Sequence, residues 1–183
     1  MPAEAATADF AIHRLTTVDA EHLRGLAELL VDCVEGGASV SFMHPMTIQK
    51  ALDFWKRVAD DVQQGARALL IAEDASGIAG TVQLVLDLPE NQPHRADLAK
   101  MLVHRRARKR GLGAALMQAA EQLGRECGKS LLVLDTVTGG DGERLYAKLG
   151  WQRCGVIPDY ALMPDGAYCS TTYFCRKLTV RAT

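Results

Sequence analysis

The chain has 183 residues, of which 48% are hydrophobic and 23% are charged, and its 21 basic and 22 acidic side chains give a net charge of −1. This composition is that of an average globular protein, and it excludes an extended polyelectrolyte, a collagen-like chain and a coiled-coil rod. The length predicts one domain over residues 1–183, which can bury about 70% of the surface that the unfolded chain exposes.

The cysteines and the apolar runs bear on the cellular compartment. The five cysteines are odd in number, include no CxxC pair and match no zinc-ligand spacing, so we expect reduced thiols, no metal and a cytoplasmic location. The first ten residues lack the apolar run of a signal peptide. No apolar stretch approaches the roughly 20 residues of a membrane span, so no membrane partner is expected.

The predicted elements follow the order strand, two helices, three strands, helix, strand, helix, two strands. Strands are expected at 10–15, 68–72, 78–86, 96–103, 130–135, 151–156 and 171–178, and helices at 19–36, 47–65, 112–126 and 142–149. Asp19 is an expected N-cap, and a loop over 157–170 joins the last two strands. Segment 96–135 is a βαβ unit that needs a right-handed parallel crossover. The other connections are hairpin-like, so the fold class is α/β (α+β) with a mixed sheet flanked by helices.

The most informative segment is 104–110, which holds five basic side chains and no acidic one. Without it the chain has 16 basic and 22 acidic residues, a net charge of −6, so the cationic charge is local. The segment leads from a strand to a helix N-terminus, where unpaired amides and the helix dipole favour an anion. Gly111 and Gly113 would let those amides approach a phosphate. The alternative is an ordinary solvated helix start.

The pattern Arg-x-x-Gly-x-Gly, here Arg108 to Gly113, resembles the pyrophosphate-binding signature of the GCN5-related N-acetyltransferase (GNAT) superfamily, and the order of elements fits that superfamily from about residue 10 to 178. The resemblance implies a GNAT fold, in which a splayed parallel strand pair binds acetyl-CoA, with no metal. The residues implied at the cofactor are Met101, Leu102, Val103, Arg108, Lys109, Arg110, Gly111, Leu112, Gly113 and Ala114. Lys109 stands where many members have Gly, so it must tolerate the local backbone angles.

Acetyl transfer to an amine needs a base for the ammonium and an acid for the departing thiolate. Asp135 ends an apolar strand at the edge where ligands bind such sheets, and burial there would raise its pKa. Asp97 lies in the strand that should line the cleft. The resemblance implicates the same pair, with Glu at the position of Asp97 in antibiotic-inactivating members, and it implies that the hydroxyl of Tyr146 is the general acid. The alternatives are a turn-capping Asp135, a solvent-facing Asp97 and a core Tyr146.

Segments that begin at Gly36, Arg95, Leu134 and Pro158 resemble antibiotic-inactivating members of the superfamily. This implies a small-molecule amine acceptor, with an antibiotic or an amino-acid-like toxin as one candidate. Topology and resemblance place Ser39, Val40, Phe42, Tyr160 and Thr171 at the acceptor. Two other functions remain open, a nucleic-acid-binding module and a CoA-binding domain without catalysis. The acidic body and the lack of aromatic residues among the cations argue against nucleic acid. By analogy with the superfamily, a homodimer also stays open.

Overall fold

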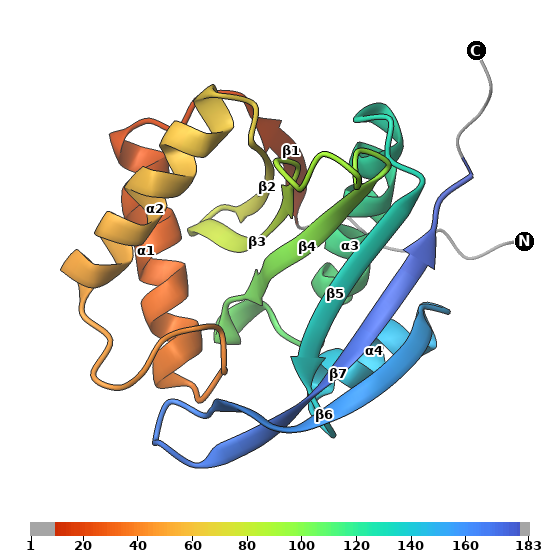
Figure 1. Cartoon of the computed structure of the whole chain (residues 1–183). Helices are drawn as coiled ribbons and strands as arrows, with labels where there is room; N and C mark the ends of the chain where they lie inside the picture. Colours follow the sequence, from red (N-terminus) through yellow and green to blue (C-terminus); the bar gives the residue numbers. More distant parts are fainter. Residues whose placement is uncertain (1–9, 180–183) are drawn as a thin grey trace, which may run out of the picture.

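The computed structural model describes residues 10–179, whose strands form a seven-stranded sheet (Figure 1). The strands are β1 (Ala11–Leu15), β2 (Arg67–Asp74), β3 (Gly77–Val85), β4 (Arg95–Val103), β5 (Leu131–Val137), β6 (Gln152–Leu162) and β7 (Tyr168–Lys177). The helices are α1 (Ala20–Glu35), α2 (Ile48–Gln63), α3 (Leu112–Glu126) and α4 (Asp141–Lys148), with a short 3-10 turn η1 (Arg105–Ala107). The predicted order of elements is therefore confirmed.

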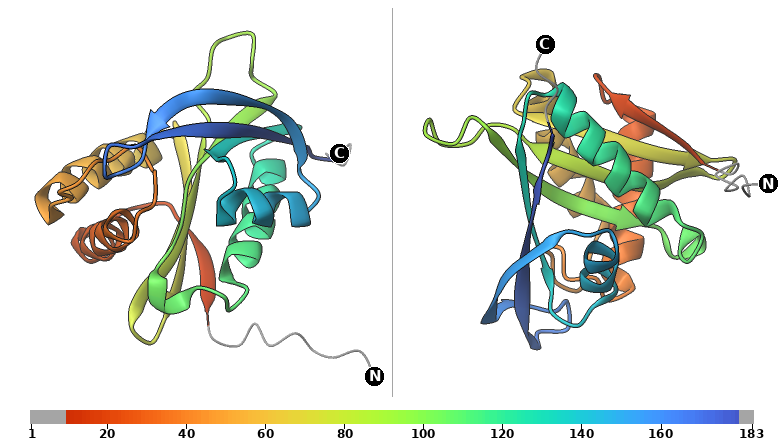
Figure 2. Two further views of the ribbon diagram at one scale, coloured as in Figure 1. Left: turned by 90° about the horizontal axis from the view of Figure 1, so that it is seen from below. Right: turned by 90° about the vertical axis from the view of Figure 1, so that its right-hand side faces the viewer.

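The sheet has the order β1-β2-β3-β4-β5-β7-β6, and only the β4–β5 pair is parallel. Helices α1 and α2 cover one face and α3 and α4 cover the other (Figure 2). Each face has its own apolar core, with Trp55 of α2 buried in one and Phe174 of β7 buried in the other. The mixed, helix-flanked sheet agrees with the expectation from the βαβ unit and the hairpins.

Capping side chains fix where the first two helices begin. Asp19 accepts hydrogen bonds from the amides of Glu21 and His22, and Thr47 accepts one from the amide of Lys50. These bonds satisfy amides that have no partner within the helix. None of the helices within residues 10–179 is long and apolar enough to cross a membrane.

Strands β4 and β5 separate part-way along their length (Figure 1). Their pairing runs from Arg95 opposite Leu131 to Asp97 opposite Val133 and goes no further. The register of β3 against β4 shifts just beyond this point, and Lys100 adopts a positive φ of 49° within the irregular stretch. A bulge of this kind bends a strand and increases its local twist, so β4 turns away from β5 and a wedge opens between them.

The prediction of a loop over 157–170 is wrong for most of this segment. β6 continues to Leu162 and β7 begins at Tyr168, so only a short turn separates them. The ladder is interrupted at Pro158, which has no amide to donate, and at Asp159, which has a φ of 50°. Pairing then resumes, because these residues form a local bulge and do not end the strand.

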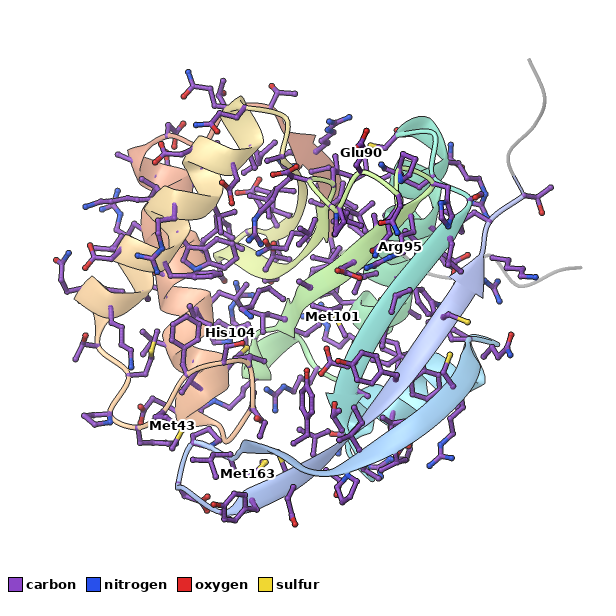
Figure 3. All side chains as sticks on the ribbon, viewed as in Figure 1. Met43, Glu90, Arg95, Met101, His104 and Met163 are labelled. Atoms are coloured by element: carbon purple, nitrogen blue, oxygen red, sulfur yellow. The ribbon has the colours of Figure 1, made fainter. Side chains whose placement is uncertain are left out.

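The β6–β7 turn lies against the loop between α1 and α2. The hydroxyl of Ser39 donates to the carbonyl of Leu162 at 2.9 Å, and the amide of His44 donates to the carbonyl of Pro164 at 3.0 Å. Met43 and Met163 mark the two segments in Figure 3. Two stretches of chain more than a hundred residues apart therefore form one wall beside the wedge.

Candidate active site

A cavity of about 460 Å³ opens where β4 and β5 part. Its floor is formed by 98–101 of β4 and 134–137 of β5, and its wall by loop 39–43 and the β6–β7 hairpin. All five residues expected at the acceptor line this cavity, namely Ser39, Val40, Phe42, Tyr160 and Thr171. The structure therefore brings together residues that the sequence separates by up to 132 positions.

Asp135 of β5 also lines the cavity. One carboxylate oxygen accepts a hydrogen bond of 2.9 Å from the hydroxyl of Thr171, which also donates to the carbonyl of Thr136. The carboxylate is thus held in a fixed direction by a buried threonine. The expected burial of Asp135 is not observed, because the residue is exposed. The widening of the wedge leaves this end of β5 without the cover that a paired β4 would give.

Asp97 lies on the same face of the sheet as Asp135 but outside the cavity lining. It stands opposite Val133, and Asp135 follows two residues later, about 7 Å further along the strand. Asp97 forms an ion pair with Arg95 of its own strand. Arg95 is labelled in Figure 3 near the end where β4 and β5 are still paired. The structure therefore places the carboxylate of Asp135 at the cavity and that of Asp97 outside its lining.

Tyr146, on α4, reaches the cavity from the other side of the sheet. Its ring packs against Trp151 and Phe174 at centroid distances of 6.2 and 6.0 Å, and the residue is only 6% exposed. Burial, assisted by the negative charge of Asp135, raises the pKa of the phenol well above its ordinary value. The hydroxyl has no hydrogen-bond partner within residues 10–179, so it is a protonated donor available to a ligand.

Two further polar residues lie at this site without any local signal in the sequence. The hydroxyl of Tyr173 lies 2.9 Å from that of Tyr160, and this hydrogen bond, with burial and the charge of Asp135, raises the pKa of Tyr173 to about 12. The second missed residue, Lys100, lines the cavity. The register of β5 against β7, which sets Tyr173 opposite Asp135, is a long-range pairing that no local motif signals.

The basic loop leads from the end of β4 into α3. Gly111 is the N-cap of α3 and has a left-handed φ of 80°, and Lys109 has a φ of 59°. Lys109, which stands where many family members have Gly, therefore adopts a left-handed conformation, at some cost for a residue other than Gly. Arg108, Lys109 and Arg110 are all exposed around the helix start. The unpaired amides of the first turn and these side chains make the start of α3 cationic, so an anion would be attracted to it.

Four of the five cations of segment 104–110 have contacts within the protein, since Arg108 donates to the carbonyl of Val103 at 3.3 Å and Arg110 lies 4.7 Å from the ring centroid of Phe10. Arg105 donates to Asp32 of α1 through its amide at 2.9 Å and its guanidinium at 2.8 Å, and Arg106 forms an ion pair with Asp74. The cationic patch available to an anion is therefore smaller than the sequence suggested. Of the other residues expected at the cofactor, Leu102 and Leu112 have side chains buried in the cores. Each of them could therefore contact the cofactor only through its backbone.

Residues 26–151 match the acetyltransferase (GNAT) family, which is more than half of the chain. The chain belongs to the GNAT acetyltransferase family. As a GNAT N-acetyltransferase, the enzyme takes its acetyl group from acetyl-CoA.

Solved structures show the same fold at low sequence identity. An N-acetyltransferase from Staphylococcus aureus Mu50 superposes with a TM-score of 0.77 at 15% identity, covering 94% of this chain and 100% of that one. A protein from Salmonella typhimurium, assigned as an acetyltransferase and solved with its cofactor acetyl-CoA, has a TM-score of 0.76 at 17% identity, covering 96% and 97%. A protein assigned as a phosphinothricin N-acetyltransferase has a TM-score of 0.72 at 17% identity, covering 92% and 99%.

Within this GNAT enzyme, the wedge and the loop offer one continuous place for the donor. The inner edges of β4 and β5 beyond Asp97 and Val133 lack a partner strand, and an extended molecule can pair with such an edge. The same wedge leads to the exposed start of α3, where the phosphates can be held. The residues present therefore fit acetyl-CoA.

Proposed function

We propose that the enzyme transfers the acetyl group of acetyl-CoA directly to the primary amine of a small molecule. The observation that carries the proposal is the cavity at the mouth of the β4–β5 wedge, which Asp135, Tyr146 and the acceptor wall share. A base, an acid and an acceptor pocket thus surround one space beside the donor site. Direct transfer needs all of them at one place.

In the proposed reaction, Asp135 takes a proton from the acceptor ammonium, directly or through one water. The free amine then attacks the thioester carbon, and amides of β4 near Met101 stabilise the charge that develops on the carbonyl oxygen. The carbon–sulfur bond breaks, the phenol of Tyr146 donates its proton to the departing thiolate, and the phenolate then recovers a proton from the nitrogen of the newly formed amide, which leaves the amide neutral. Asp97 is the weaker candidate for the base, because Arg95 engages it away from the cavity lining.

We further propose that the acceptor is an antibiotic or an amino-acid-like toxin. Segments such as 36–43 and 158–166 are similar to segments of the tabtoxin resistance protein, and this likeness supports the proposal. The fold similarity to a protein assigned as a phosphinothricin N-acetyltransferase is compatible with it. Loop 39–43 and Tyr160 are the parts of the cavity wall that would recognise such a molecule.

A thermal-shift titration followed by a thiol-release screen tests the function. Acetyl-CoA should raise Tm by several degrees, because a ligand of the folded state adds stability by mass action, and a single-stranded oligonucleotide should not. Amines, amino acids and antibiotics are then screened for release of CoA thiol. Stabilisation by the oligonucleotide in place of acetyl-CoA would point to a nucleic-acid module, and stabilisation by acetyl-CoA without thiol release from any acceptor would point to a non-catalytic domain.

A further inference from the structure

Lys100 places a cation inside the acceptor cavity. Its ammonium donates to the hydroxyl of Ser41 at 3.1 Å and lies 5.6 and 6.0 Å from the ring centroids of Phe54 and Phe42. The backbone at Lys100 has a φ of 49° in the β4 bulge, and such strain in a residue other than Gly is concentrated at functional positions. The bulge therefore directs a lysine into the site at an energetic cost.

The charge of Lys100 has no counter-ion in the free protein. Within residues 10–179, no carboxylate lies within ion-pair distance of its ammonium; its contacts are a hydroxyl and two aromatic faces. Burial and the positive charge of Arg67 lower the pKa of Lys100, and the negative charge of Asp135 only partly offsets them. A half-buried cation without an anion costs folding free energy unless a ligand supplies the anion.

The same cavity presents a carboxylate, Asp135, and a cation, Lys100. A molecule whose only charged group is an ammonium would be attracted by the carboxylate of Asp135 and repelled by the ammonium of Lys100. A zwitterion satisfies both groups, with its ammonium at Asp135 beside the donor site and its anionic group at Lys100 near loop 39–43. The ring of Phe42, which lines the cavity, would cover the apolar part of such a ligand on this side.

We infer that Lys100 binds the carboxylate of the acceptor, so that the substrate class is free amino acids or molecules with an amino-acid head. This inference rests on the proposed function, because it places the acceptor amine at Asp135. It assigns to Lys100 the role of a specificity-determining residue, and it excludes simple amines and peptides with a blocked carboxylate as good substrates.

The test uses pairs of acceptors that differ only in charge. A panel of α-, β- and γ-amino acids, each with its carboxamide, is assayed by thiol release. The wild type should prefer at least one amino acid over its carboxamide by at least about 10-fold in kcat/KM. In Lys100→Met, kcat/KM for that acid should fall about 100-fold, the usual worth of a charge-assisted hydrogen bond, while the value for the carboxamide stays within about 3-fold. Lys100→Arg should restore part of the preference.

Lys50→Met is the matched control. The ammonium of Lys50 lies 5.8 Å from the same Phe42 ring, but Lys50 does not line the cavity, so its loss should leave the acid-to-carboxamide ratio unchanged. An equal loss of both activities in Lys100→Met, with acetyl-CoA still raising Tm, would mean that Lys100 only supports loop 39–43. A wild type that acetylates amines without preferring the acid overturns this inference alone, whereas no turnover of any acceptor overturns it together with the proposed function.

Discussion

At the scale of single residues, the proposed acid, Tyr146, and the proposed base, Asp135, have different surroundings. Tyr146 is buried among aromatic rings, and this burial raises the pKa of its phenol above the ordinary value. Asp135 is exposed to the cavity and held by Thr171. A protonated donor and an accessible carboxylate on two sides of one space suit the two proton transfers of amide formation.

Removing the hydroxyl of Tyr146 tests its role as the acid. Tyr146→Phe should lower kcat roughly 10- to 1,000-fold, the usual range for general acid catalysis, with little change in the Tm shift given by acetyl-CoA. The ring contacts with Trp151 and Phe174 remain, so the fold should be retained. Steady-state thiol release at saturating acceptor measures the effect, and an unchanged kcat would sink the assignment.

The two aspartates can be separated by isosteric substitution. Asp135→Asn should reduce kcat/KM about 100-fold or more, because the base is lost, while Asp97→Asn should cost less than about 5-fold, because that carboxylate serves mainly Arg95. Thiol-release assays of both variants at one pH make the comparison. A larger loss in the Asp97 variant would transfer the role of base to Asp97.

At the scale of elements, the basic segment 104–110 is anchored by carboxylates of other segments. Asp32 of α1 accepts hydrogen bonds from the amide and guanidinium of Arg105, and Asp74 of β2 pairs with Arg106. Burial tends to raise the pKa of Asp32, but the bonds from Arg105 and the charges of His104 and Arg105 outweigh it, so the pKa is lowered. The carboxylate therefore contributes stability at all pH values above its ordinary pKa of 3.8.

Substituting Asp32 should loosen this anchor. In Asp32→Asn we expect about 1–2 kcal/mol of lost stability and a several-fold higher KM for acetyl-CoA, with kcat little changed. The stability difference from the wild type should shrink as the pH falls through the lowered pKa, because the wild-type carboxylate is then protonated too. Thermal unfolding between pH 2 and 7 measures this. Glu28→Gln, an exposed position on the same helix, is the control, and an equal KM change there would contradict the anchoring role.

Local patterns predicted most elements and the general place of the site. Apolar periodicity, the caps at Asp19 and Thr47 and the glycine-rich loop are all local signals, and each led to the correct element. Lys100 was missed because it lies in a bulge, where strict alternation of side chains no longer says which way a residue points. The length of β6 was misjudged because Pro158 normally ends a strand, whereas here it forms a bulge.

At the scale of the whole molecule, the charge of the chain is organised by the fold. The sequence suggested one cationic segment on an acidic body, and the structure shows that two of its arginines hold the loop to α1 and β2. The remaining cations lie at the start of α3, while the acceptor wall is built from loop 39–43 and the β6–β7 hairpin. The basic helix start and the acceptor wall therefore come from different segments, whereas β4 and β5 contribute residues to the floor between them.

Hydrogen exchange at the wedge between β4 and β5 should also report whether the donor is bound. Amide hydrogens of these strands that point into the wedge lack a partner strand beyond Asp97 and Val133, so without a ligand they exchange with solvent deuterium sooner than those of the paired ends. A bound pantetheine arm would occupy those same amides and slow their exchange. The deuterium uptake of two short peptides, spanning 98–103 and 134–137, therefore reports donor occupancy without any turnover.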